Sequence, residues 1–197
     1  MRLLRTGRWL ALLIVVVALA VMSPAVGTAD DPVPDTTGEG TNEALPDVLK
    51  SATFDQNLGD EVPLDLAFTD ETGKSVTLAD YAGDKPILLT MNYFTCDSLC
   101  PLMLDAVARG LKPIPYTIGQ DFELVTVSIN PDERPEDAAA VKQQMVAHYQ
   151  RDGAAASWHM LTGDQATIDE LAQAVGFNYT WDETTQQYAH PSGVIFL

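Results

Sequence analysis

The residues with the most chemical potential are Cys96 and Cys100, the only two cysteines of the chain. Three residues separate them, so we expect them to occupy positions i and i+4 and to share one face of the first helical turn. Such a pair can close a disulfide, attack another disulfide, or bind a soft metal ion such as Cu(I), or Zn(II) with further ligands. A purely structural disulfide would contribute little stability, because it closes a very short loop.

A metal site would need a further ligand, and the chain has three histidines. His148 falls in a predicted helix and is interpreted as a packing or surface residue. His159 follows Trp158 in a short predicted strand and is interpreted as structural. His190 lies in a loop just before the last predicted strand. In the sheet that the strand order predicts, that loop lies beside the dithiol, so His190 is the histidine that the geometry favours.

Other potential ligands have simpler explanations. Three methionines in apolar patterns are predicted to pack in the core: Met91, Met103 and Met145. Three acidic pairs are predicted to form solvated surface or the first turns of helices: Asp132-Glu133, Glu136-Asp137 and Asp182-Glu183. We therefore expect neither set to bind a metal.

Apolar periodicity predicts the elements that position the cysteines. Two short strands form a hairpin, and a continuous apolar run before the cysteines predicts a central strand buried on both faces. Pro101 suits the first turn of the helix that follows. The predicted strands span 63–69, 75–78, 86–94, 122–129, 158–161 and 193–197. The predicted helices begin near 101, 135 and 164 and end near 111, 153 and 175.

This alternation predicts an α/β fold, a thioredoxin-like sandwich with a central, mostly parallel sheet, an N-terminal β-hairpin and flanking helices. A dithiol between the first long strand and a helix N-terminus is how that fold carries its chemistry. The helix dipole and the unpaired N–H groups there lower the pKa of a thiol, which serves both disulfide exchange and metal binding.

The charge balance excludes one class of function. The chain has 28 acidic and 11 basic residues, a formal net charge of −17. A surface this acidic repels phosphate backbones, so nucleic-acid binding is not expected. It favours cationic partners or metal cations through long-range steering.

The N-terminus predicts export from the cytoplasm. Arg2, Arg5 and Arg8 precede an apolar run over residues 9–22, the pattern of a signal peptide or an N-terminal anchor over residues 1–29. No cysteine follows that run to carry a lipid. Residues 30–58 predict an acidic flexible linker, and residues 59–197 the folded domain. The expected location is periplasmic or extracytoplasmic, with membrane contact only through an uncleaved N-terminus. The last predicted strand has no turn after it, so we expect the domain to be incomplete at its C-terminus.

Four segments together resemble the Sco/SenC family of copper proteins. Residues 87–101 resemble its copper-binding strand and Cys-x-x-x-Cys motif, and residues 125–131 the strand and loop that follow. Residues 158–163 match its W-x-x-L-T-G strand, and residues 189–191 fall where the family has its histidine ligand. The segments occur in the family's order from about Gly59 to Leu197. Two features depart from it: Asn130 stands where the family usually has Asp, and the family continues beyond residue 197.

The resemblance implies a copper site of Cys96, Cys100 and His190, for Cu(I) and, as a further state, Cu(II). It implies copper delivery to the binuclear centre of cytochrome c oxidase, or reduction of the thiols of that centre. The expected partners are the copper-site subunit of the oxidase and other copper or thiol-redox proteins. The alternative is an enzyme, a thiol–disulfide oxidoreductase or peroxiredoxin-like reductase with Cys96 and Cys100 as its redox pair. The interpretation favours a metallochaperone over an enzyme.

Overall fold

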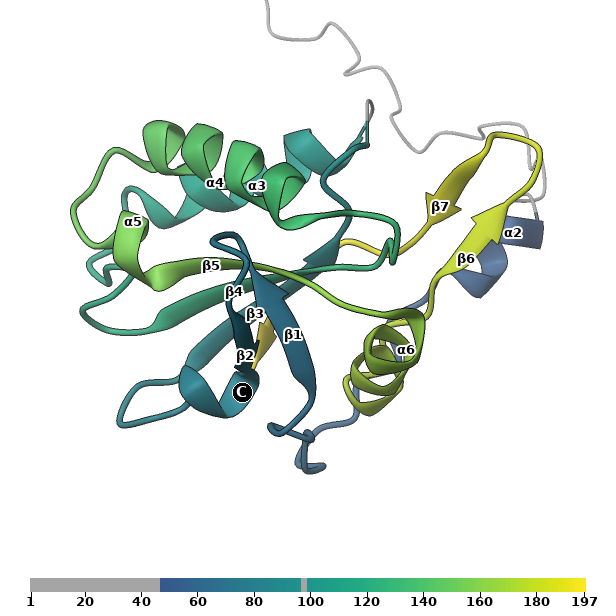
Figure 1. The fold of residues 1–197 in the computed structure, drawn as a ribbon, viewed down its shortest axis with the longest axis horizontal. Helices are drawn as coiled ribbons and strands as arrows, with labels where there is room; N and C mark the ends of the chain where they lie inside the picture. The colour runs from purple at the N-terminus through teal and green to yellow at the C-terminus, as the bar shows by residue number, and fades with distance from the viewer. Residues whose placement is uncertain (1–46, 97–98) are drawn as a thin grey trace, which may run out of the picture. The chain divides into compact units, whose positions relative to one another are not determined.

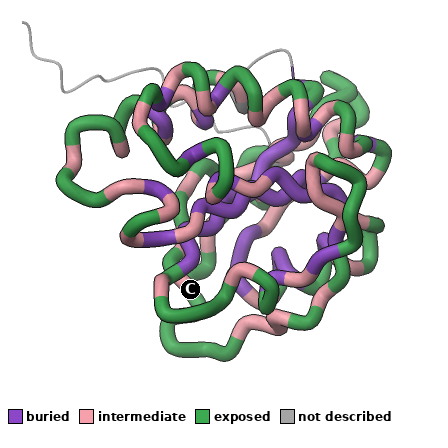
Figure 2. Tube along the Cα trace, turned by 60° about the vertical axis from the view of Figure 1, so that its left-hand side comes forward, coloured by how far each residue is buried: buried purple, intermediate pink, exposed green. Residues whose placement is uncertain are grey.

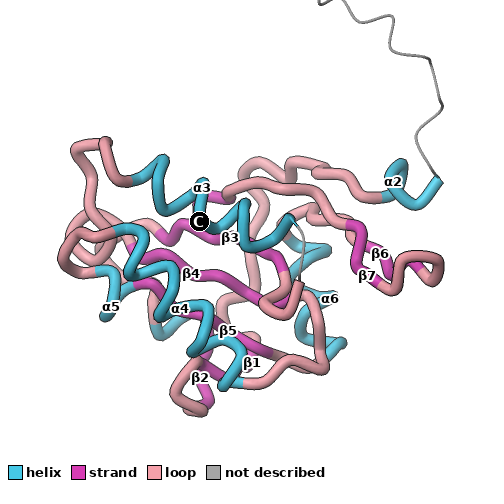
Figure 3. Tube along the Cα trace, turned by 90° about the horizontal axis from the view of Figure 1, so that it is seen from above, coloured by secondary structure: helices cyan, strands magenta, loops and turns pink. Residues whose placement is uncertain are grey.

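A computed structural model describes residues 47–96 and 99–197, apart from the side chains of Asp47, Leu99 and Cys100. Its centre is a six-stranded sheet in the order β2-β1-β5-β4-β3-β8. These strands are β1 (Ala67–Asp70), β2 (Ser75–Thr77), β3 (Ile87–Asn92), β4 (Glu123–Ser128), β5 (Trp158–Thr162) and β8 (Ile195–Phe196). Figure 3 shows β3, β4, β5 and β1 side by side.

The sheet is mixed, with a parallel centre. Strands β3, β4 and β5 run parallel, as the prediction required. The pairings of β1 with β2, β1 with β5, and β3 with β8 are antiparallel. Because the three central strands share one direction, the loops that follow β3 and β4 leave the sheet at the same edge. Those loops carry Cys96 and Glu133.

Helices cover both faces of the sheet. The long helices are α3 (Leu99–Leu111), α4 (Pro135–Tyr149) and α6 (Gln165–Ala174), and the short ones are α2 (Asp47–Ser51), α5 (Ala154–Ser157) and the 3-10 turn η1 (Leu78–Asp80). In Figure 1, α3 and α4 lie over one face and α6 lies on the other side. No helix of the described residues is both long and apolar enough to cross a membrane.

The core explains why these residues form these elements. All six residues of β3 are buried, which fits its continuous apolar sequence and its position between β4 and β8. Figure 2 shows the buried stretches gathered in the interior, with exposed stretches around them. Leu89 and Met91 pack in one core cluster with α6, whereas Leu88 packs in a second cluster with Trp158. Burying an aliphatic side chain of this size contributes about 1.5–3 kcal/mol.

The polypeptide before the sheet packs against the end of α6. The Asp55 amide donates to the Gly176 carbonyl at 2.8 Å, and the Asn178 amide donates to the Thr53 carbonyl at 2.9 Å. The Phe54 ring meets Phe177 edge to face at 5.5 Å. These apolar and backbone contacts bind residues 53–55, in the last part of the predicted linker over 30–58, to the domain. Residues 1–46, with the predicted signal or anchor, lie outside the described residues.

The structure also contains a hairpin that periodicity did not predict. Strands β6 (Thr180–Asp182) and β7 (Gln187–Ala189) pair antiparallel, separate from the main sheet. The turn between them places Gln186 at a φ of 55°. The hairpin leads directly to His190, so it positions the third predicted ligand.

Candidate metal centre

Cys96 lies at the carboxyl edge of the sheet, in the loop that follows β3. Its side chain is buried and belongs to the same core cluster as Tyr93. The prediction that both cysteines share a helical turn is wrong in one respect, because α3 begins at Leu99 and Cys96 precedes it. Cys100 is the second residue of α3, and its side chain is outside the described set. A position in the first turn of a helix favours the thiolate form of a cysteine.

His190 follows β7 and is held by its own neighbour and by aromatic rings. Its Nδ1 lies 2.8 Å from the Pro191 carbonyl oxygen. A carbonyl can only accept, so Nδ1 carries the proton and the lone pair of the neutral ring is on Nε2. The imidazole stacks on Phe177 at 6.0 Å and meets the Tyr93 ring edge to face at 6.0 Å.

The protonation of His190 suits a metal ligand. Burial lowers the pKa of His190 below the ordinary histidine value, and the hydrogen bond to Pro191 opposes that effect. The ring is therefore neutral at neutral pH, the form in which imidazole binds metals. Proteins commonly fix a ligating histidine through such a bond to its other nitrogen.

Tyr93 connects the two described members of the predicted site. It stands three residues before Cys96 in the chain, shares its core cluster, and contacts the His190 ring. The complete three-residue site lies partly outside the described side chains, because it includes Cys100. Among the side chains that are described, no three of the His, Cys, Asp and Glu type form a metal-binding group.

The other two histidines lie in unrelated surroundings. His148 on α4 has its Nδ1 2.7 Å from Asp105 of α3. His159 on β5 stacks on Tyr81 at 3.9 Å, with its Nε2 3.3 Å from Glu123. Burial lowers the pKa of His159, against the opposing effect of the Glu123 carboxylate. Met91 and Met145 are fully buried in the two core clusters.

Sequence reasoning missed Glu133, which it assigned to the solvated surface. Glu133 is buried, with 6% of its surface exposed. Its carboxylate accepts hydrogen bonds from the backbone of Phe94 and Thr95, directly before Cys96. Its position in the sequence could have predicted this role. Glu133 follows β4, and the neighbouring parallel strand β3 leads to the cysteines at the same edge of the sheet. The preceding Asn130 uses its side-chain oxygen locally, accepting from the Asp132 amide at 3.1 Å.

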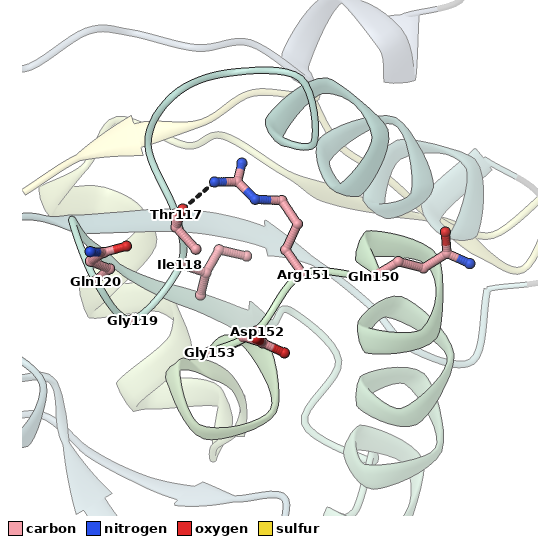
Figure 4. A pocket seen from close by; sticks show the side chains of 8 residues that line it. All are labelled: Thr117, Ile118, Gly119, Gln120, Gln150, Arg151, Asp152 and Gly153. Atoms are coloured by element: carbon pink, nitrogen blue, oxygen red, sulfur yellow. Dashed lines mark hydrogen bonds between the residues drawn. The ribbon is translucent and has the colours of Figure 1, made fainter.

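A large surface pocket lies away from Cys96 and His190, and its residues stabilise the fold. It has a volume of 660 Å³ and lies between the segments 117–120 and 150–153 (Figure 4). Arg151 extends from it to donate to the carbonyls of Ile114 at 2.9 Å and Tyr116 at 3.1 Å, and also bonds Thr117. These contacts hold the connection between the end of α3 and the start of β4, at the opposite end of α3 from Cys100.

Comparisons with solved structures agree with this architecture. A protein from Aquifex aeolicus VF5, assigned only provisionally to electron transfer, is 27% identical with a TM-score of 0.60, covering 71% of this chain and 78% of that chain. Arabidopsis thaliana ScoI, solved with copper bound, is 20% identical with a TM-score of 0.55, covering 67% of this chain and 78% of that chain. A search of curated proteins finds no match.

A mixed α/β sheet flanked by helices, with a cysteine at the carboxyl edge of its central strand, is the thioredoxin-like fold of Sco structures, and it confirms the predicted fold class. The profile of the SCO1/SenC family matches residues 55–197, and the chain belongs to that family. The match begins near the segment that packs on α6.

Proposed function

We propose that the protein binds copper through Cys96, Cys100 and His190 and takes part in the assembly of cytochrome c oxidase. Copper is the cargo in this account. Two thiolates and a neutral imidazole suit Cu(I), a soft ion that accepts low coordination numbers. A site with so few ligands is open to attack by the ligands of a partner, which transfer requires.

The observation that carries the proposal is the state of His190. Its ring is turned so that Nδ1 bonds the Pro191 carbonyl, and burial favours the neutral form. The same ring packs on Tyr93, three residues before Cys96. The hydrogen bond to the Pro191 carbonyl makes Nε2 the acceptor nitrogen of the neutral ring, the arrangement that metal-ligating histidines commonly have.

The cellular role rests on family membership and on the sequence of the N-terminus. We place the protein in the periplasm or another extracytoplasmic space, exported by a signal peptide or held by an N-terminal anchor over residues 1–29. Its proposed partner is the copper-site subunit of the oxidase. In an oxidising compartment the two thiols can also form a disulfide, which would prevent copper binding until they are reduced.

Copper stoichiometry in matched variants tests the proposal. The reduced protein should bind one Cu(I) per chain, measured anaerobically against a chromophoric chelator. Cys96→Ala, Cys100→Ala and His190→Ala should each weaken binding strongly. His148→Ala is the matched control and should bind as wild type, because His148 lies between α3 and α4 beside Asp105. Unchanged Cu(I) affinity in His190→Ala would show that the proposed ligand set is wrong.

The same variants separate the enzymatic alternative. A thiol–disulfide reductase needs both cysteines but not an imidazole ligand. If His190→Ala retains full disulfide turnover and wild type binds no Cu(I), the reductase assignment replaces the copper assignment.

A further inference from the structure

Glu133 lies beneath the cysteine loop, the segment 93–96 that follows β3, and it makes an unusual set of hydrogen bonds. Its Oε1 accepts from the Thr95 amide at 2.6 Å and the Thr95 hydroxyl at 2.7 Å. Its Oε2 accepts from the Phe94 amide at 2.9 Å and the Ser128 hydroxyl at 2.6 Å. Both oxygens are therefore used twice, and the carboxylate joins the loop after β3 to the end of β4.

These contacts differ from an ordinary surface acid. Removing a carboxylate from water is costly unless hydrogen bonds replace the lost hydration. All four donors to Glu133 are neutral, and two are the backbone N–H groups of the residues immediately before Cys96. An apolar residue at this position would leave these two N–H groups without their acceptor. The carboxylate instead fixes the backbone that sets the direction of the Cys96 side chain.

We propose that Glu133 is the positioning residue of the Cys96 loop. It holds residues 94 and 95 in the conformation that presents the Cys96 thiol, an inference that extends the proposed copper site and rests on it. A preorganised ligand loses less conformational freedom when it binds, so affinity depends on the residues that hold it. Outer residues that orient metal ligands are typically worth about 10- to 100-fold in metal affinity.

The decisive variant is Glu133→Gln, which keeps the size of the side chain. Its amide has only one accepting oxygen, and its NH₂ group would face a backbone N–H donor. The hydrogen bonds on that side of the Glu133 side chain are therefore lost. We expect Cu(I) affinity to fall by about tenfold or more, in the range typical of outer residues that orient ligands. In the metal-free protein, the Phe94 and Thr95 amides should exchange hydrogen faster and Cys96 should be alkylated faster.

Glu71→Gln is the matched control. Glu71 is also a little-exposed carboxylate that accepts from a backbone amide, that of Met160 at 3.1 Å, and it pairs with Lys142. It follows β1, and within the described part of the chain it makes no hydrogen bond to the segment that carries Cys96. This variant should lose stability while its Cu(I) affinity and the exchange of Thr95 stay as in wild type.

Two results would overturn the inference. One is wild-type Cu(I) affinity in Glu133→Gln, and the other is an equal loss of affinity in Glu71→Gln, which would reveal a general effect of destabilisation. If Glu133→Gln fails to fold, Thr95→Val decides, because it removes a single hydroxyl donor at an exposed residue. We expect a loss of about fivefold, the value of one hydrogen bond, and unchanged affinity would reject the role.

Failure of the copper proposal would look different. Wild-type protein would then bind no Cu(I) at all. The amide exchange of residues 94 and 95 and the alkylation of Cys96 would still decide whether Glu133 positions the thiol.

Discussion

Replacing Phe177 by leucine tests how packing holds the proposed histidine ligand. Phe177 has 2% of its surface exposed and lies beneath the His190 ring at 6.0 Å. It also meets Phe54 edge to face at 5.5 Å. Leucine fills much of the same space but removes these two ring contacts and a third, with Tyr179 at 6.3 Å. The variant therefore changes the packing that supports His190 without replacing a proposed ligand.

The magnitude follows from those contacts. Each aromatic pair contributes about 0.5–1.5 kcal/mol beyond its buried area. With the smaller loss from the reduced side chain, we expect a destabilisation of about 2 kcal/mol. For a domain of this size that corresponds to a fall in Tm of about 4–8 °C. Because the bond from His190 to Pro191 remains, Cu(I) affinity should fall by only about three- to tenfold, less than for loss of an outer residue bonded directly to a ligand.

Phe68→Leu supplies the comparison. Phe68 on β1 is equally buried, with 2% of its surface exposed, and belongs to the same core cluster. Its ring lies beside Gly163, and among the described residues the aromatic rings that contact His190 are Tyr93 and Phe177. Thermal unfolding and chelator competition on both variants should show similar losses of stability but a loss of Cu(I) affinity only in Phe177→Leu. Equal affinities in the two variants would refute the idea that this ring supports the ligand.

Two further predictions concern regions outside the site. Folding depresses the pKa of His159 below its ordinary value of 6.5, so its contribution to stability is complete above that value and is lost as the pH falls through the folded-state pKa. In His159→Phe, which keeps a ring against Tyr81, the fall in Tm between about pH 7 and pH 5 should therefore be smaller than in wild type, and an equal fall would show that His159 is not responsible. Gly176→Ala should release residues 53–57 from α6, because Gly176 has a φ of 68° and an added Cβ would lie 1.7 Å from the Asp55 carbonyl oxygen. Limited proteolysis should then cut near residue 55, and wild-type resistance would contradict this packing.

The sequence predicted the parts of the fold that depend on long, regular patterns. The apolar run from Ile87 to Asn92 required a strand covered on both faces, and β3 is buried throughout. The helix predicted to end near residue 111 ends at Leu111. Such elements are specified locally, since each residue contributes to the same periodic signal.

Features that depend on tertiary context could not be predicted. Strands β6 and β7 have three residues each, and their turn uses Gln186 at positive φ instead of the glycine that signals a hairpin. Glu133 belongs to a run of acidic and polar residues, a pattern that, in the sequence alone, predicts a solvated surface. Its burial arises only because β4 lies beside β3, which brings its loop under residues 94 and 95.

X-ray absorption spectroscopy of the Cu(I)-loaded protein tests the central claim most directly, because it reports the atoms bound to copper. The account predicts two sulfur donors and one imidazole nitrogen in wild type, with the nitrogen lost in His190→Ala and kept in His148→Ala. A spectrum of wild type without imidazole, or an unchanged spectrum in His190→Ala, would contradict the assignment of Cys96, Cys100 and His190 as the copper ligands.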